Sequence, residues 1–495
     1  MKYVSTRDES ESRRVSAAEA ILEGLAGDGG LYMPQTVPRL GKGELEQIGK
    51  LPYAERAAQI LKKFLPDYND ADLLASCREA YAEDKFPGGP APLHRLSDQT
   101  HVLELWHGPT CAFKDMALQL MPRLLSSALK ITAGEKRTAL ILVATSGDTG
   151  KAALEGFRDV EGVKIMVFYP VDGVSKIQKL QMMTQEGKNV CVCAIRGNFD
   201  DAQNGVKRIF SDSEAQHALA ECNSFFSSAN SINWGRLVPQ IVYYISAYCD
   251  LVNSGTIQSG EAINISVPTG NFGNIFAGYL AKEMGLPVKR FICASNRNNI
   301  LTDFLDSGVY DRNRRFYTTM SPSMDILISS NLERLLYLKA GAARTAGYMR
   351  SLREKGAYRV EDEVYQNISS DISGLFCNEE QTAQTIQRTF ETYHYLCDTH
   401  TAVGLFCAEK FLEQTQDNAK TLVVSTASPY KFAVDVYQAL TGERAADEMA
   451  SLDLLSSYTG TAVPRQLGSL KEKAVRFDRV VDSGDMMAEV LNFAG

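Results

Sequence analysis

The sequence lacks the patterns that mark several classes of protein. No apolar run reaches the roughly 18 residues that a membrane-spanning helix needs, so no membrane partner is expected. The ten cysteines are scattered over 495 residues without a Cys-x-x-Cys pair, which suggests neither a disulfide framework nor a zinc site. The six histidines form no His-Glu-x-x-His motif, and no metal is expected. The net charge is −8 without a basic cluster, which argues against a nucleic-acid partner.

What is present is the composition of a soluble globular protein. Hydrophobic residues make up 44% of the chain and charged residues 23%. A chain of this length is too long for one ordinary core, so two or three domains are expected. The first residues, Met1 to Asp8, lack the apolar core of a signal peptide, and the cytoplasm is therefore the expected compartment.

The first 95 residues have mainly helical patterns. Apolar residues recur at helical spacing from Ala17 to Leu25, and this run ends at the glycine-rich turn Gly27–Gly30. Further helices are predicted over Tyr53–Phe64 and Asp70–Tyr81. The segment Phe86–Pro92 holds three prolines and two glycines, so it cannot form regular structure and marks the first domain boundary.

Beyond this boundary, apolar strands alternate with helices. The expected strands are Thr138–Ala144, Val163–Tyr169, Asn189–Ile195, Ala262–Val267, Val288–Ala294 and Thr421–Val424. The expected helices are Ser175–Gln185, Asp200–Phe210, Trp234–Leu251 and a segment that starts near Gly273. Strands that are apolar along their whole length are typical of parallel sheets covered by helices on both faces. The predicted fold class is therefore α/β, with ligands at the carboxyl ends of the strands.

The domain organisation expected from these patterns has three parts. Residues 1–95 form an N-terminal helical domain, residues 96–228 a small α/β domain, and residues 229–495 a large α/β domain. The large domain carries a helical insertion at about 300–420, which holds the least motif information.

Lys114 is the residue around which the chemistry is predicted. It follows the turn His107-Gly108-Pro109 and precedes an apolar run from Met116 to Leu129. The partial positive charge of a helix N-terminus and exclusion from water both disfavour a protonated amine. A neutral amine can attack a carbonyl and form a Schiff base. The alternative is a solvated lysine in the first turn of a helix, which is where most lysines lie.

A second motif, Gly270-Asn271-Phe272-Gly273-Asn274, connects a predicted strand to a predicted helix. Its glycines let the backbone approach a ligand, and the free N–H groups of a helix start bind phosphate. Gly270 and Gly273 are three residues apart, so the spacing is not that of a dinucleotide-binding fingerprint. We favour a phosphate site; the alternative is an ordinary turn between strand and helix.

A third motif, Thr145-Ser146-Gly147-Asp148-Thr149-Gly150-Lys151, fails as a P-loop. Thr145 stands where the first glycine of that loop is required, and Ala152 stands where a magnesium-binding hydroxyl belongs. A kinase or ATPase is therefore not expected. The turn is rich in hydroxyls and backbone amides, which suits a carboxylate ligand, although an ordinary capped helix start explains it equally well.

Two further segments place polar side chains before helices. Ser425–Phe432 follows the strand Thr421–Val424, and its hydroxyls are suited to the nitrogen of a heterocycle or, alternatively, to a helix cap. Ser228–Arg236 gathers asparagine, serine and arginine at a helix start, which suits a phosphate or other anion. The alternative there is an asparagine cap with a surface arginine.

Taken together, these motifs resemble the threonine synthases, a family of the fold type II (tryptophan-synthase-β-like) pyridoxal-phosphate enzymes. The resemblance extends from Gly27–Pro34 to Ser425–Ala427, and it is most specific at His107–Asp115 and Gly270–Asn274. It implies two mainly parallel sheets covered by helices, with pyridoxal 5'-phosphate as the cofactor.

The resemblance also implies roles for individual residues. Lys114 forms the internal aldimine, Thr426 bonds the pyridine nitrogen, and Asp148 lies near the ring hydroxyl, although relatives often have asparagine at that place. The implied cofactor-binding residues are Phe113, Lys114, Asp148, Gly270, Asn271, Phe272, Gly273, Asn274 and Thr426. The candidate substrate-binding residues are Ser146 and Thr149 for a carboxylate, and Lys151, Asn230, Ser231, Asn233 and Arg236 for a phosphate. Ser428 replaces a histidine that many relatives have, so the role of that histidine cannot be carried over.

The activity implied is the conversion of O-phospho-L-homoserine and water to L-threonine and phosphate, by elimination and β-replacement. Lys114 would act as acid and base, and Arg236 and Lys151 would bind the leaving phosphate. The alternatives are a phospholyase or a serine/threonine dehydratase of the same fold, and a catalytically silent phosphate- or nucleotide-binding module. The expected partner is the small-molecule substrate, and the expected assembly is a monomer or homodimer.

Overall fold

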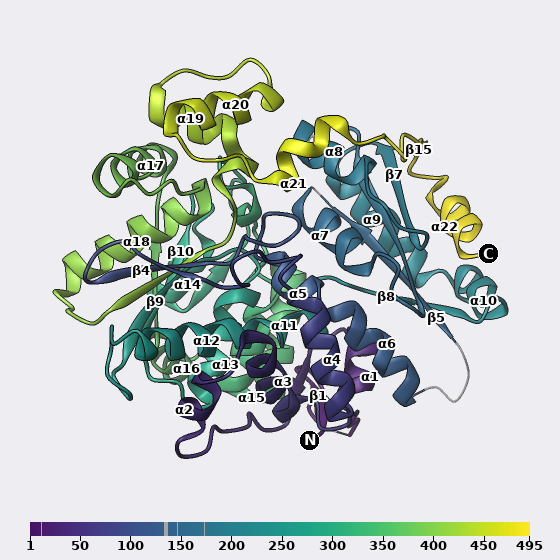
Figure 1. Cartoon of the computed structure of the whole chain (residues 1–495). Coiled ribbons are helices and arrows are strands. Elements are labelled where there is room, and N and C mark those ends of the chain that lie inside the picture. The colour runs from purple at the N-terminus through teal and green to yellow at the C-terminus, as the bar shows by residue number, and fades with distance from the viewer. Residues whose placement is uncertain (11, 133–136, 146, 173) are drawn as a thin grey trace.

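Two mainly parallel β-sheets lie side by side and are flanked by helices (Figure 1). The computed structural model describes residues 1–10, 12–132, 137–145, 147–172 and 174–495. This architecture confirms the α/β fold class predicted from the apolar strands. None of the helices in the described part of the chain has the length and apolarity that crossing a bilayer would take.

The larger sheet has six strands in the order β13-β10-β9-β14-β4-β3. Its strands are β3 (Leu93–Arg95), β4 (Thr100–Glu104), β9 (Ile263–Pro268), β10 (Val288–Ser295), β13 (Ile372–Phe376) and β14 (Thr421–Ser425). All neighbours are parallel except β3 and β4. The helices that pack on it are α13 (Gly273–Glu283), α14 (Ile300–Ser307), α16 (Asp362–Ser369) and α18 (Thr399–Thr415).

The smaller sheet has five strands in the order β15-β7-β6-β5-β8, and all its neighbours are parallel. Its strands are β5 (Thr138–Ala144), β6 (Val163–Pro170), β7 (Val190–Arg196), β8 (Ser224–Ser227) and β15 (Val480–Asp482). The helices that pack on it are α6 (Met121–Thr132), α7 (Asp148–Phe157), α9 (Phe199–Ser211) and α10 (Ser213–Glu221).

The N-terminal residues form a group of helices and a two-stranded sheet at the bottom of Figure 1. Its elements are β1 (Tyr3–Ser5), α1 (Ala17–Glu23), β2 (Tyr32–Pro34), α2 (Glu44–Gly49), α3 (Tyr53–Phe64) and α4 (Asp70–Ala80). A capping box between Ser16 and Glu19 begins α1. The group shares one continuous core with the larger sheet, because Tyr3 and Phe64 pack on the buried Trp234.

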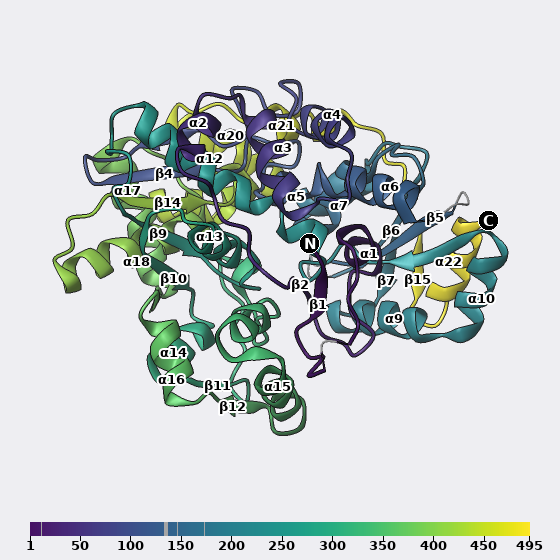
Figure 2. The ribbon, with the colours of Figure 1, turned by 90° about the horizontal axis from the view of Figure 1, so that it is seen from below.

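The remaining elements connect or cover the sheets. The helices are α5 (Lys114–Leu118), α8 (Lys176–Met183), α11 (Trp234–Leu237), α12 (Gln240–Asn253), α15 (Leu332–Lys355), α17 (Glu379–Tyr393), α19 (Ala433–Thr441), α20 (Glu448–Thr459), α21 (Arg465–Gly468) and α22 (Met486–Ala494). The shorter pieces are β11 (Val309–Asp311), η1 (Pro322–Met324), β12 (Ala357–Arg359), η2 (Pro429–Phe432) and η3 (Ser469–Glu472). Seen from below, α14, α15 and α16 form one group with β11 and β12 (Figure 2).

Two expectations from the sequence need correction. The helix predicted over Trp234–Leu251 is two helices, α11 and α12, because Pro239 lacks the N–H that a continuous helix needs. The sheets also divide the chain differently from the boundaries at 95 and 228. β3 and β4 join the larger sheet, and β15 returns from the C-terminal end to the smaller one. Proline and glycine show where a chain turns, but not which sheet its next strand joins.

Candidate active site

Lys114 lies at the start of α5, and its side chain is buried. The three residues before it pair with the chain that follows β14. The Phe113 N–H donates to the Thr426 carbonyl at 2.8 Å, and the Ser428 N–H donates to the Cys111 carbonyl at 3.0 Å. These bonds fix Lys114 beside Thr426, as the sequence interpretation required, at the carboxyl end of β14.

A carboxylate faces the lysine. Lys114 Nζ lies 3.4 Å from Oδ2 of Asp148, the first residue of α7. The other oxygen of Asp148 accepts from Lys431 Nζ at 2.6 Å and from Gln178 Nε2 at 2.8 Å. The two lysines hold the pKa of Asp148 well below its usual range despite its burial. Asp148 is therefore an anion at neutral pH.

The pKa of the Lys114 amine is lowered. Burial is the largest cause, and the charges of Lys431 and Arg236 add to it against the opposing effect of Asp148. This is the direction expected from the sequence. An amine of lowered pKa spends more time neutral, and only the neutral form is a nucleophile.

The Gly270–Asn274 segment joins β9 to α13, as predicted. Phe272 adopts the left-handed conformation with φ 63°, which turns the backbone into the helix. Asn274 Oδ1 accepts from the hydroxyls of Tyr243 and Tyr244 at 2.5 and 2.6 Å. The Asn274 Nδ2 amide is buried without a hydrogen-bond partner among the residues that the structure describes. An unsatisfied buried donor at a helix start suits an anionic ligand.

The amine and this segment face the same place, because both contact Ser323. Ser323 Oγ lies 3.4 Å from Lys114 Nζ and 3.4 Å from Asp148 Oδ2. A Cβ atom added to Gly270 would lie only 2.7 Å from the Ser323 carbonyl oxygen. The residues present thus fit a group with an aldehyde at one end and a phosphate at the other.

Ser323 is itself held by a buried histidine. Its N–H donates to His400 Nε2 at 3.2 Å, and His400 Nδ1 lies 2.7 Å from Asp398 Oδ2. Since Nε2 accepts a bond, the imidazole proton is on Nδ1 and donates to Asp398. The pair therefore fixes the position of the Ser323 turn over Lys114.

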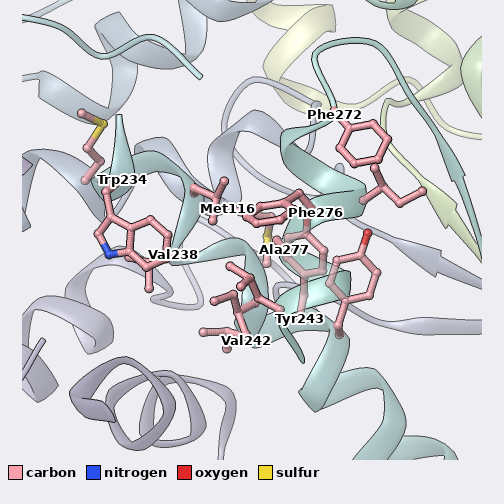
Figure 3. Packing of buried hydrophobic residues seen from close by; sticks show 14 of the residues in the cluster. Met116, Trp234, Val238, Val242, Tyr243, Phe272, Phe276 and Ala277 are labelled. Carbon is pink, nitrogen blue, oxygen red and sulfur yellow. The ribbon is translucent and has the colours of Figure 1, made fainter. Parts of the chain in front are cut away.

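The apolar core behind the site is continuous. Figure 3 shows Met116 from α5, Trp234 and Val242 from α11 and α12, and Phe276 from α13 packed together. The helices that begin at the lysine, at the Ser228–Arg236 segment and at the glycine loop thus share one rigid support.

Arg236 is a buried arginine without a carboxylate partner. Its Nη1 donates to the Ala229 carbonyl at 2.9 Å, and it forms no ion pair within the described part of the chain. Burial lowers its pKa to about 10. An arginine in this state lacks the counterion that buried charges normally have, which favours an anionic ligand.

The other candidates for binding a substrate phosphate are less available than Arg236. Lys151 Nζ is already bound by Glu155 at 3.2 Å and by Gln185 at 2.5 Å. The Asn233 amide donates to backbone carbonyls and its oxygen caps α11, so the side chain is fully used by the protein. Asn230 is exposed and Ser231 half-buried in the turn before α11.

The carboxylate candidates are placed in part. Thr149 is half-buried in the first turn of α7, beside Asp148. Ser146, the other candidate, lies outside the described residues.

Four residues of the site were missed by the sequence interpretation. Lys431 lies within the Ser425–Phe432 segment, whose sequence pattern indicates no role for it, and only its burial against Asp148 reveals one. Ser323, His400 and Asp398 lie in the region 300–420, which holds the least motif information. The one available signal was a histidine two residues after an aspartate at a helix start.

Comparisons with known proteins cover nearly the whole chain. Three family models match: "Threonine synthase N terminus" over residues 2–81, "Pyridoxal-phosphate dependent enzyme" over 85–427, and "Threonine synthase, C-terminal" over 401–490. Human threonine synthase-like 1 is 39% identical over 498 residues, which cover 97% of this chain. The chain spans 66% of that relative's length, which is just under two thirds.

Two further relatives match over almost their full length. The threonine synthase of Pseudomonas aeruginosa is 39% identical, with 95% of this chain and 97% of the relative covered. The crystal structure of PLP-bound threonine synthase from Brucella melitensis superposes with a TM-score of 0.89 at 37% identity, covering 100% of this chain and 99% of that one.

Proposed function

The chain belongs to the threonine synthase family of fold type II pyridoxal-phosphate enzymes, and on that premise we propose that it converts O-phospho-L-homoserine and water to L-threonine and phosphate, as the last step of threonine biosynthesis. The membership confirms the family resemblance noted in the sequence, together with pyridoxal phosphate as the cofactor. One observation carries the proposal: the buried, pKa-lowered amine of Lys114 shares a neighbour, Ser323, with the phosphate-type loop at Gly270.

The cofactor, when bound, supplies the electron sink that lets protons leave the carbon atoms of an amino acid. We propose that Lys114 carries its aldehyde and that Gly270–Asn274 bind its phosphate. The unsatisfied Nδ2 of Asn274 supports the second assignment. Phe113 and Asp148 would line the ring, and Thr426 would bond its nitrogen, by resemblance to the family.

The protein's own contribution is to move protons and to hold the charged groups beside the substrate in place. Lys114, once freed by the substrate, would take the proton from the substrate's α-carbon and later return it. Its lowered pKa, caused mainly by burial, increases the fraction of the amine in the neutral form, which is the form that accepts a proton. Lys431 and Gln178 hold Asp148 in place, so the carboxylate facing Lys114 stays ionised and oriented throughout.

The leaving phosphate needs positive partners. We propose that Arg236 is the main positive partner of this phosphate. Its buried charge has no carboxylate partner among the described residues, and it lies close enough to Lys114 to lower the pKa of that amine. Lys151 would have to leave Glu155 to take part, and Asn233 would act through the backbone turn that it holds. Asn230 and Ser231, together with Thr149 and Ser146 for the carboxylate, complete the proposed substrate contacts.

The proposal is tested by Lys114→Ala beside Lys164→Ala, a lysine of β6 that bonds two backbone carbonyls far from the site. Lys114→Ala should lose the visible absorbance band of the bound cofactor and all turnover, whereas Lys164→Ala should retain both. Native-rate threonine production by Lys114→Ala would refute the proposal. Product analysis from O-phosphohomoserine separates threonine from the 2-oxobutyrate that a phospholyase would release.

We also propose that the protein acts in the cytoplasm on this small molecule alone, as a monomer or homodimer. The acidic net charge of −8 supports the absence of a nucleic-acid partner. Light scattering of the purified protein determines the assembly, and fractionation of the source cells determines the compartment.

A further inference from the structure

The first turn of α15 contacts the phosphate-type loop through Asn331. The backbone N–H and the side-chain Nδ2 of Asn331 both donate to the Asn271 carbonyl, each at 3.0 Å. Asn331 is fully buried. A peptide unit is planar and trans, so its N–H points opposite to its C=O. Holding the Asn271 carbonyl toward α15 therefore directs the Phe272 N–H away from α15.

Arg334 links this contact to two other parts of the chain. Its Nη1 donates to Asn331 Oδ1, its Nη2 to the Ile232 carbonyl at 2.6 Å, and its Nε to the Tyr32 carbonyl at 3.2 Å. Its side chain is completely buried, and burial lowers its pKa to about 9. Burying a guanidinium whose three acceptors are all neutral costs free energy. This indicates that the role of Arg334 is to hold those three acceptors in place.

The Ile232 carbonyl belongs to the segment that ends at Arg236. The same peptide unit carries the Asn233 N–H, which closes a turn by donating to the Asn230 carbonyl at 3.1 Å. The orientation of this peptide sets where α11 begins and therefore where Arg236 lies. One arginine thus contacts both the proposed cofactor-phosphate loop, through Asn331, and the proposed substrate-phosphate segment.

The first turn of α15 is held in place by residues near the N-terminus of the chain. Glu333 accepts from both Nε and Nη2 of Arg7 at 2.8 Å, and from Thr6 Oγ1 at 2.6 Å. These bonds hold the start of α15 against the residues that directly follow β1, and the Arg334 bond to the Tyr32 carbonyl adds a contact to β2.

We propose that Arg334, acting through Asn331 and the Ile232 carbonyl, is a positioning residue that sets the cofactor-phosphate loop and the substrate-phosphate segment relative to each other. The proposal rests on the phosphate assignments made above. It predicts that the two sites lose affinity together when Arg334 changes, but that only the cofactor site is affected when the Asn331 amide changes.

Two variants separate these effects. Arg334→Lys keeps the charge, but an ammonium group cannot reach three acceptors that a planar guanidinium fork reaches. Asn331→Asp keeps the acceptor for Arg334 and removes the Nδ2–H donor to Asn271. The control is Arg56→Lys: Arg56 is also a buried arginine with several acceptors, the carbonyls of Gly49, Leu51 and Ser246 and the Asp250 carboxylate, and it touches neither segment.

Three readouts are needed for each variant. Absorbance titration of the cofactor-free protein gives the dissociation constant of pyridoxal phosphate. Calorimetry with inorganic phosphate, on the cofactor-loaded protein, gives the affinity of the substrate-phosphate site without turnover. Thermal unfolding reports general damage.

We expect Arg334→Lys to weaken both affinities about tenfold or more, as the loss of bonds to a charged group implies. Asn331→Asp should weaken cofactor binding about tenfold and leave phosphate binding unchanged. Arg56→Lys should lower the melting temperature with both affinities intact. The proposal is overturned if Arg334→Lys changes only the melting temperature or only one affinity. These affinities do not depend on which product the enzyme releases, so a failed product assignment would leave the result readable.

Discussion

Replacing Arg236 with methionine should make the protein more stable and less active at the same time. Arg236 is buried, donates one hydrogen bond to the Ala229 carbonyl, and has no ion-pair partner in the described residues. Methionine fills a similar volume without a charge. A residue kept for packing would show a loss of stability instead, so the sign of the change is informative.

The magnitude follows from the pKa. Burial lowers the pKa of Arg236 from 12.5 to about 10, a difference of about 2.5, and each unit corresponds to 1.36 kcal/mol. The folded state therefore carries a penalty on the order of 3 kcal/mol. A base with a lowered folded pKa is penalised at every pH below that pKa, so the full penalty is present at pH 7. Loss of the bond to Ala229 costs about 1 kcal/mol, which leaves a net gain of about 2 kcal/mol.

The effect on activity should be opposite. A contact from a charged donor to phosphate contributes roughly 1.5–3 kcal/mol, so kcat/KM for O-phosphohomoserine should fall on the order of 10- to 150-fold. Cofactor binding should be unchanged. Inorganic phosphate should raise the melting temperature of the parent protein, but not that of Arg236→Met.

Denaturant unfolding of the cofactor-loaded protein, followed by steady-state kinetics, tests both signs. The control is Arg56→Met: Arg56 has a carboxylate partner, Asp250, at 2.7 Å, and its removal should destabilise. If Arg236→Met destabilises the protein as much as Arg56→Met does, Arg236 contributes to stability in the absence of an anion. The proposal that it binds an anionic ligand then loses its support.

Three further predictions concern the other parts of the site. Lys431→Met should lower the free energy of unfolding by about 3–5 kcal/mol, because it leaves Asp148 as a buried charge with one partner fewer; unchanged denaturant midpoints would contradict this. Gly270→Ala should weaken cofactor affinity at least tenfold, because its Cβ would meet a backbone carbonyl oxygen at 2.7 Å, whereas Gly347→Ala, with open space around it, should not. In the cofactor-free protein the pKa of Lys114 is lower in the folded chain than in the unfolded one, so between that pKa and about 10.5 the unfolded chain binds more protons. The free energy of unfolding should therefore rise with pH across this window, and Lys114→Met should lack the rise.

The elements with a strong local pattern could be predicted from the sequence. The helix Tyr53–Phe64 and the strand Thr138–Ala144, the latter a continuous apolar run, have the bounds that their sequence patterns predict. The Gly270–Asn274 turn was also located correctly between a strand and a helix. In each case the deciding interactions lie within about ten residues, so the pattern is written in one stretch of sequence.

The parts that could not be predicted depend on contacts between distant segments. Nothing around Ser323 indicates that it meets Lys114, and nothing around Asn331 indicates that it holds the Asn271 carbonyl. Lys431 reads as an ordinary surface lysine until its burial against Asp148 is known. Such contacts arise from the packing of the two sheets, which no local periodicity encodes.

The charges of the site explain why these distant contacts exist. Lys114 and Lys431 both face the buried Asp148 carboxylate, and the charges of Lys431 and Arg236 together lower the pKa of Lys114, so three basic side chains lie close to one another at the site. Burying basic side chains close to one another is costly, and anions that enter from outside can offset that cost. The phosphate of the cofactor and that of the proposed substrate are such anions, and each would stabilise the folded state by an amount that grows with its concentration relative to its dissociation constant. The hydrogen bonds of His400 and Arg334 act against the repulsion between these basic side chains, because they tie the segments that carry the site to one another.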